Sequence, residues 1–301
     1  MSIAAEILRL GMRYLVKPRL DPDPQIDLLR KSIESVHRFI PEPPRRTREV
    51  NLDAGGVKAI RTTTPRSLEE RHILYLHGGG YVMGSPREYR DFLWRIAHVV
   101  SARVLCIWYR LAPEHPFPAA LDDAVKAYCW LLAQGAAPRR LTIMGDSAGG
   151  GLVLATLLRL RDAALPLPAA AVALSPWTDL ALSGDSMHTN AGADPSMRVE
   201  RARAFARHYL AGADPRHPYA SPLYGELRGL PPILIQVGSD EILRDDSVRM
   251  ADNLRAAGSP VDIEIWPRMP HVWQLYARVL PEGRRAIAHI GAFIERELLR
   301  A

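Results

Sequence analysis

Between residues 70 and 300 the chain alternates short apolar runs with longer amphipathic segments, and this alternation restricts its fold more than any other feature. The apolar runs have the length of buried strands. Predicted strands are Ile73–His77, Val104–Tyr109, Leu141–Gly145, Ala169–Leu174, Ile233–Val237 and Val261–Trp266. Predicted helices span 87–100, 118–134, 148–162, 245–257 and 283–299. Short apolar strands joined by helices form βαβ units, so we expect an α/β domain with a mostly parallel sheet between helical layers.

The N-terminal region departs from this alternation. Apolar residues fall at helical spacing from Ile3 to Leu15 and from Ile26 to Phe39, with prolines between the two segments. We expect the apolar stripes of these helices to pack on the rest of the protein rather than to lie on a membrane. A hairpin is predicted next, with strands at 47–53 and 57–63 around Gly55-Gly56.

A second departure is a long insertion between two predicted strands. More than fifty residues separate the strand that ends near Ser175 from the one that begins near Ile233. They include a polar loop at 183–196 and a helix-like run from Arg198 to Leu210. An insertion at the strand ends of a parallel sheet lies over the ligand site. We therefore predict a cap made of residues 1–44 and 181–215, above a main domain made of 45–180 and 216–301.

The pentapeptide Gly145-Asp146-Ser147-Ala148-Gly149 is the strongest chemical signal. It lies between a predicted strand and a predicted helix, which is the setting that a G-x-S-x-G nucleophile elbow requires. The glycines permit a tight turn that lifts the serine hydroxyl above the sheet, at a helix N-terminus. Ser147 is therefore the candidate nucleophile. No Gly-Lys-Ser/Thr follows, so the turn is not a phosphate-binding loop.

A glycine-rich loop after another strand complements the elbow. His77-Gly78-Gly79-Gly80-Tyr81 follows the strand directly, and glycines allow backbone N–H groups to face a developing oxyanion. The amide of Ala148, next to the nucleophile, is a further donor. We predict an oxyanion hole formed by Gly78, Gly79 and Ala148.

The remaining members of a catalytic triad are predicted from chain order, which in such folds is nucleophile, acid, histidine. Asp240 follows the strand Ile233–Val237 and is the predicted acid, with the adjacent Glu241 as the alternative. His271 follows the last strand after a short loop and is the predicted base. Asp245 and Asp246 lie at the start of the next helix, where acidic residues stabilise the helix dipole.

These motifs together resemble a known family. His77-Gly78-Gly79-Gly80, Tyr109-Arg110-Leu111-Ala112-Pro113-Glu114-His115 and the Ser147 pentapeptide, in this order, are similar to the hormone-sensitive-lipase family, and specifically to its bacterial family IV esterases of the α/β-hydrolase fold. The resemblance covers roughly residues 70 to 295. It implies an eight-stranded sheet, a helical cap and cofactor-free hydrolysis of esters with short-to-medium acyl chains. It is also compatible with a homodimer, and it agrees with Asp240 as the acid.

Composition limits the other functions open to the chain. The net charge of +6 comes from scattered arginines, without the clusters or motifs of a nucleic-acid-binding protein. No His-rich motif has metal-ligand spacing, so no metal is predicted. Two cysteines in apolar patterns and the lack of a signal-peptide core or a spanning apolar stretch indicate a cytoplasmic protein with no membrane insertion.

Two alternative functions share these residues. An amidase or deacetylase uses the same triad and the same acyl-enzyme chemistry, and sequence does not distinguish it from an esterase. A receptor on the same fold binds a small ligand without hydrolysing it, but the presence of His271 beside the serine and the acid argues against that function. Trp177, Met187, Phe205 and Tyr209 are candidate linings of the substrate pocket, although Phe205 and Tyr209 also fit the core of the cap.

Overall fold

The computed structural model describes residues 1–36 and 40–300, and its centre is an eight-stranded sheet. The strand order is β1-β2-β4-β3-β5-β6-β7-β8. β2 pairs antiparallel with β1 and β4, and the remaining neighbours are parallel. The strands are β1 (Arg48–Asp53), β2 (Lys58–Thr63), β3 (His72–Leu76), β4 (Arg103–Ile107), β5 (Leu141–Asp146), β6 (Ala170–Leu174), β7 (Ile233–Gly238) and β8 (Val261–Trp266). This confirms the predicted fold class, its hairpin and its eight strands.

The helices follow the predicted segments closely. Those of the main domain are α3 (Arg90–Val99), α4 (Ala119–Ala133), α5 (Ala148–Asp162), α8 (Arg244–Ala256) and α9 (Pro281–Arg300). Those outside the alternation are α1 (Ile3–Gly11), α2 (Ile26–Val36), α6 (Ser186–Thr189) and α7 (Val199–Leu210). Shorter turns are η1 (Met12–Val16), η2 (Lys17–Arg19), η4 (Pro86–Tyr89), η5 (Pro138–Arg140), η6 (Pro222–Tyr224) and η7 (Trp273–Tyr276). The short helix α6 lies in the segment that was predicted to be a loop.

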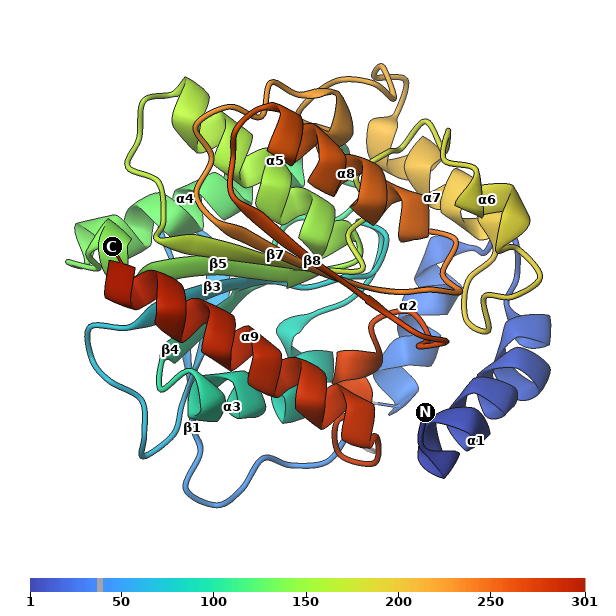
Figure 1. Ribbon diagram of the computed structural model, residues 1–301, viewed down its shortest axis with the longest axis horizontal. Helices are drawn as coiled ribbons and strands as arrows, with labels where there is room; N and C mark the ends of the chain where they lie inside the picture. Colours follow the sequence, from blue (N-terminus) through green and yellow to red (C-terminus); the bar gives the residue numbers. More distant parts are fainter. Residues whose placement is uncertain (37–39, 301) are drawn as a thin grey trace.

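Alternate side chains of the central strands pack into two separate core layers. In β3, Leu74 and Leu76 face the layer under α4, α5 and α8, whereas Ile73 and Tyr75 face the layer under α3 and α9. Figure 1 shows these two groups of helices on opposite faces of the sheet. Because both faces are covered, the strands are apolar at nearly every position, which is why they appear in the sequence as continuous runs.

The N-terminal and inserted segments lie together at the carboxyl ends of the strands. Lys17 Nζ donates to the carbonyl oxygens of Ala191 and Asp194, and Arg198 Nε donates to the carbonyl of Lys17. In Figure 1, α1 and α2 in blue and α6 and α7 in yellow occupy the same side of the molecule. Two segments far apart in the sequence therefore cover the carboxyl ends of the strands together.

The packing of α1 corrects one sequence prediction. Leu8 and Met12 turn toward the protein, but Ile3, Ile7 and Leu15 are exposed, so only part of the apolar stripe packs on its own protein as expected. The predicted second helix was extended to Phe39, which lies outside the described residues. Across residues 1–36 and 40–300, no helix has both the length and the apolarity required to cross a membrane.

Candidate active site

Ser147 lies at the turn between β5 and α5, in a backbone conformation that side-chain-bearing residues rarely adopt. Its φ and ψ are 53° and −122°. A Cβ on Gly145 would lie 2.5 Å from the carbonyl oxygen of Gly149, and a Cβ on Gly149 would overlap the carbonyl oxygens of Leu76 and His77. Both flanking positions must therefore be glycine. The backbone strain held at Ser147 is typical of a residue whose position serves a function.

His271 follows β8 and is hydrogen-bonded to a buried carboxylate. Its Nδ1 lies 2.7 Å from Oε2 of Glu241, whose side chain is fully buried. Burial lowers the pKa of His271, but the charge and hydrogen bond of Glu241, together with the charges of Asp194 and Asp146, raise it by more, so the net pKa lies above the ordinary 6.5. Donation from Nδ1 to this carboxylate leaves Nε2 unprotonated in the neutral ring, which is the tautomer that can accept a proton from a hydroxyl.

The histidine's partner corrects the prediction for Asp240. Asp240 is partly exposed and accepts a hydrogen bond from its neighbour Ser239, 2.8 Å away, whereas the adjacent Glu241 turns back under the end of β7. Glu241 Oε1 accepts from the amide of Gly238 at 2.6 Å and from the hydroxyl of Ser175 at 2.7 Å. These two bonds leave Oε2 for His271. The acid that the sequence ranked second is therefore the one in contact with the histidine.

The glycine-rich loop also differs in part from the prediction. The amide of Gly78 donates to Asp146 Oδ1 at 3.0 Å and to the hydroxyl of Tyr89 at 2.9 Å, so it is not directed at a substrate. Within the described residues, the amides of Gly79, Gly80 and Ala148 have no hydrogen-bond acceptor. Gly80, which the sequence analysis did not include in the oxyanion hole, thus has a free amide in this loop, whereas Gly78 does not.

Asp146 holds this loop from within the nucleophile pentapeptide. Besides the Gly78 amide, its carboxylate accepts hydrogen bonds from Tyr75 at 2.7 Å and Tyr89 at 2.9 Å. Burial raises the pKa of Asp146 to about 6, although these hydrogen bonds favour the charged form. The sequence gave no reason to connect Asp146 with the glycine loop, because the contact joins residues 68 positions apart.

The predicted pocket residues divide into two groups. A cavity of about 330 Å³ contains Ser147 and His271, and Trp177 and Phe205 contribute apolar walls. Met187 and Tyr209 are buried and do not line the cavity; Tyr209 stacks on Tyr81 with ring centroids 3.8 Å apart. Two segments missed by the sequence also contribute, namely Ser196-Met197 before α7 and Leu275-Tyr276 in η7.

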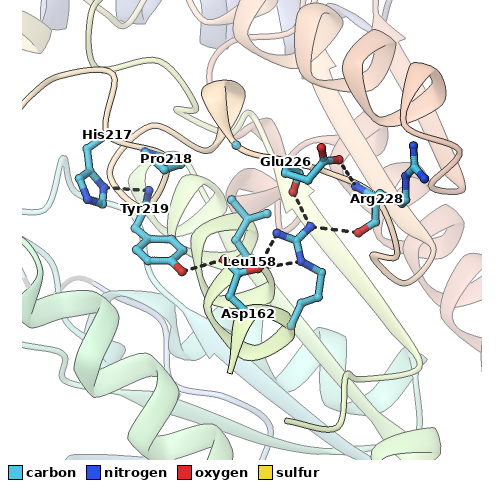
Figure 2. A pocket seen from close by; sticks show the side chains of 9 residues that line it. Leu158, Asp162, His217, Pro218, Tyr219, Glu226 and Arg228 are labelled. Atoms are coloured by element: carbon cyan, nitrogen blue, oxygen red, sulfur yellow. Dashed lines mark hydrogen bonds and ion pairs between the residues drawn. The ribbon is translucent and has the colours of Figure 1, made fainter. Parts of the chain in front are cut away.

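A larger hollow lies elsewhere and has no serine, threonine, cysteine or lysine among its lining residues. It has a volume of about 760 Å³ and is formed between α5 and the chain that leads to β7 (Figure 2). Asp162 accepts a hydrogen bond from Tyr219 there, His217 Nδ1 accepts from the Tyr219 amide, and the Arg161 side chain binds the carbonyls of Glu226 and Arg228. Its polar groups thus satisfy one another, and volume alone does not identify the active site.

No candidate metal site is found in the part of the chain that the structure describes. Across residues 1–36 and 40–300, no three carboxylate, histidine or cysteine side chains are grouped so that they could hold an ion. The chemistry available at the cavity is that of a hydroxyl, an imidazole, a carboxylate and backbone amides.

Comparison with known proteins finds similarity over nearly the whole chain. A family profile described as alpha/beta hydrolase fold matches residues 73–275. An acetyl-hydrolase from Streptomyces hygroscopicus is 52% identical over 230 residues, covering 76% of this chain and 77% of its own. An esterase from Acinetobacter venetianus is 34% identical over 285 residues, covering 93% of each. A crystal structure of an esterase from the bacterial hormone-sensitive lipase family superposes with a TM-score of 0.93 at 45% identity, over 99% of both chains.

Proposed function

This chain belongs to the α/β-hydrolase fold family and, within it, to the bacterial hormone-sensitive-lipase esterases, and from this we infer that Ser147, His271 and Glu241 act together in ester hydrolysis. The protein is thus a serine ester hydrolase. The observation that carries the assignment of residues is the 2.7 Å contact of Glu241 with His271, because His271 lines the same cavity as the strained Ser147.

The proposed reaction begins with attack of Ser147 Oγ on the ester carbonyl carbon while His271 Nε2 accepts the hydroxyl proton. The Glu241 carboxylate stabilises the imidazolium that forms. The amides of Gly79, Gly80 and Ala148 donate hydrogen bonds to the oxyanion of the tetrahedral intermediate. His271 then gives its proton to the departing alcohol oxygen, and a water molecule hydrolyses the acyl-enzyme by the same steps.

We assign short-to-medium acyl chains to the enzyme from the size of its cavity. A volume of about 330 Å³ lies at the small end of the range typical of ligand pockets, roughly 300–1,000 Å³. Phe205 lies so close to Gly80 that a Cβ on this glycine would overlap the phenylalanine ring. Helix α7 therefore packs directly against the glycine-rich loop. This contact supports the proposal that residues 1–44 and 181–215 act as a cap that limits substrate size.

The two free thiols support a further proposal about location. Cys106 is buried and Cys129 half-buried, and neither is disulfide-bonded. Unpaired cysteines are typical of a reducing compartment, so we propose that the protein works in the cytoplasm.

A chain-length series tests the proposed function. p-Nitrophenyl acetate, butyrate, octanoate and palmitate are compared for the wild type, Ser147→Ala and the control Ser196→Ala, whose serine lines the same cavity. We expect wild type and Ser196→Ala to hydrolyse the shorter esters, and Ser147→Ala to be inactive. Efficient hydrolysis of palmitate by the wild type would contradict the size limit, and turnover by Ser147→Ala would contradict the nucleophile. A matched anilide is included because the same residues also suit amide cleavage.

A further inference from the structure

The exposed apolar side chains of this protein are concentrated at one place. Half of the large apolar residues that are exposed in the described part of the chain lie within its first sixteen residues: Met1, Ile3, Ile7, Leu10, Tyr14, Leu15 and Val16. Ile3 is 82% exposed and Ile7 66%. Single exposed apolar residues are ordinary on a protein surface, but a contiguous group marks an interaction site.

Helical geometry places three of these residues on one line. Ile3, Ile7 and Leu10 are separated by four and three positions, so in α1, with 3.6 residues per turn, they share one face. At 1.5 Å per residue this stripe is roughly 10 Å long. Tyr14 is exposed in η1, the π-helical turn that continues the helix beyond the stripe. The opposite face carries Ala5, which is buried. The helix therefore has two apolar sides, one packed on the protein and one exposed.

The helix and the turns that follow it lie beside two segments of the active-site cavity. Its inner residues Ala5 and Leu8 pack in one cluster with Trp273, which begins the η7 turn that supplies Leu275 and Tyr276 to the cavity. Beyond the helix, Lys17 Nζ is bonded to the carbonyls of Ala191 and Asp194, just before the cavity residues Ser196 and Met197. Figure 1 shows α1 at the edge of the molecule, with its outer side away from all other elements.

The charges around the stripe are mostly positive. Residues 1–20 contain four cations, Arg9, Arg13, Lys17 and Arg19, and a single anion, Glu6. Glu6 is already paired with Arg9 at 2.8 Å and with Arg268 at 3.3 Å. Arg19 is exposed, and the Arg13 guanidinium lies 5.9 Å from the ring of Tyr14, beyond the stripe. An apolar face with an interfacial tyrosine and flanking arginines is the pattern of a helix that lies in a lipid–water boundary.

We propose that the outward face of α1 and η1 is a docking surface for an anionic lipid bilayer. The apolar side chains enter the boundary between head groups and acyl chains, and Arg13 and Arg19 contact lipid phosphates. A second copy of the chain fits this face less well. If two copies paired through this face, Arg13 of one copy would lie near Arg13 of the other or near the positive N-terminal end of its helix α1. Glu6 could not neutralise these charges, because it is already paired. A negatively charged surface neutralises these cations.

Docking in this way would place the cavity next to the lipid boundary, because α1 packs beside η7 and Lys17, which follows α1, is bonded just before Ser196 and Met197. Apolar esters concentrate in that boundary. The proposal concerns binding alone, so it stands or fails independently of the catalytic residues assigned above.

Vesicle flotation of the full-length protein tests the proposal. Vesicles of phosphatidylcholine mixed with phosphatidylglycerol are compared with pure phosphatidylcholine at low and high salt. The variants are Ile7→Glu on the stripe and Leu299→Glu as the control, since Leu299 is 74% exposed near the other end of the chain. We expect the wild type and Leu299→Glu to float with the anionic vesicles, less so at high salt, and Ile7→Glu to lose about tenfold in bound fraction. Thermal unfolding of each variant, monitored by circular dichroism, shows that the comparison is made between folded proteins.

Three results would overturn the proposal. The wild type could fail to float with anionic vesicles, or Ile7→Glu could float as well as the wild type. Alternatively, sedimentation could find a wild-type dimer that Ile7→Glu converts to a monomer, without flotation of either, and the stripe would then be a contact between two copies.

Discussion

Replacing Glu241 by glutamine is the sharpest test of the site geometry. The amide oxygen of glutamine can still accept hydrogen bonds from Gly238 and Ser175, so the side chain keeps its position. The amide nitrogen then faces His271 Nδ1 and must donate to it. The ring is driven into the tautomer with its proton on Nε2, and this nitrogen can no longer accept the proton of Ser147.

The expected loss of activity is large because one contact controls both tautomer and charge. An acid-to-amide change at the equivalent place of a serine protease triad lowers kcat by about 10⁴-fold, which corresponds to about 5.5 kcal/mol of transition-state stabilisation. The pH profile should change as well. Glu241 raises the pKa of His271 above 6.5, so the wild type should lose activity on acidification at a pH above this value. Without the charge the pKa falls, and the residual activity of Glu241→Gln should persist to lower pH.

The assay is kcat/KM for p-nitrophenyl butyrate between pH 5 and pH 9, with Asp240→Asn as the matched control. Asp240 is partly exposed and contacts Ser239 rather than the histidine, so we expect its variant to stay within about threefold of the wild type. A 10⁴-fold loss in Asp240→Asn, with near-normal activity in Glu241→Gln, would refute the assignment of Glu241 and restore the acid predicted from the sequence.

Three further predictions concern stability and specificity. Ser147→Gly should melt at a higher temperature than Ser147→Ala, by roughly 2–4 °C for each kcal/mol of backbone strain that glycine relieves at φ 53°. Differential scanning calorimetry measures the two midpoints, and equal midpoints would mean that the turn is unstrained. Phe205→Ala should shift the preferred substrate toward longer p-nitrophenyl esters, because it opens the cavity beside the glycine-rich loop. An unchanged chain-length profile would show that another residue sets the limit on acyl-chain length. Burial and the nearby charge of Asp179 raise the pKa of Asp246 to about 8 in the folded state, whereas the unfolded chain releases this proton near 3.8. The stability of the fold that depends on protonated Asp246 is therefore lost as the pH rises through 8. The free energy of unfolding, measured with urea at pH 5 and pH 9, should therefore fall less steeply with pH in Asp246→Asn than in the wild type, by at most about 1.4 kcal/mol per pH unit. The same pH dependence in both proteins would argue against the raised pKa.

Local patterns predicted the fold well. α5 and β8 have the bounds expected from the sequence, because a run of apolar residues between helical segments admits few other interpretations. The strand–serine–helix turn was also predictable, since the glycines around Ser147 are required by atoms that lie close in the same motif or in the neighbouring strand. The N-terminal helix was predicted, but the face that it buries was not. Apolar periodicity shows that a helix has an apolar side and does not show what covers it.

The sequence alone identified the candidate nucleophile, the candidate base and the glycine-rich loop, because each belongs to a short motif at the end of a predicted strand. Only the tertiary structure decided which of two adjacent carboxylates contacts His271, and which glycine amides remain free. Asp240 and Glu241 are neighbours in the chain, but the turn after β7 sends one toward solvent and folds the other back to the amide of Gly238. The amide of Gly78 is likewise bonded to Asp146, 68 residues away, so it is not free for the proposed oxyanion hole. These choices depend on hydrogen bonds between distant segments, and such bonds exist only once the strands have been brought side by side.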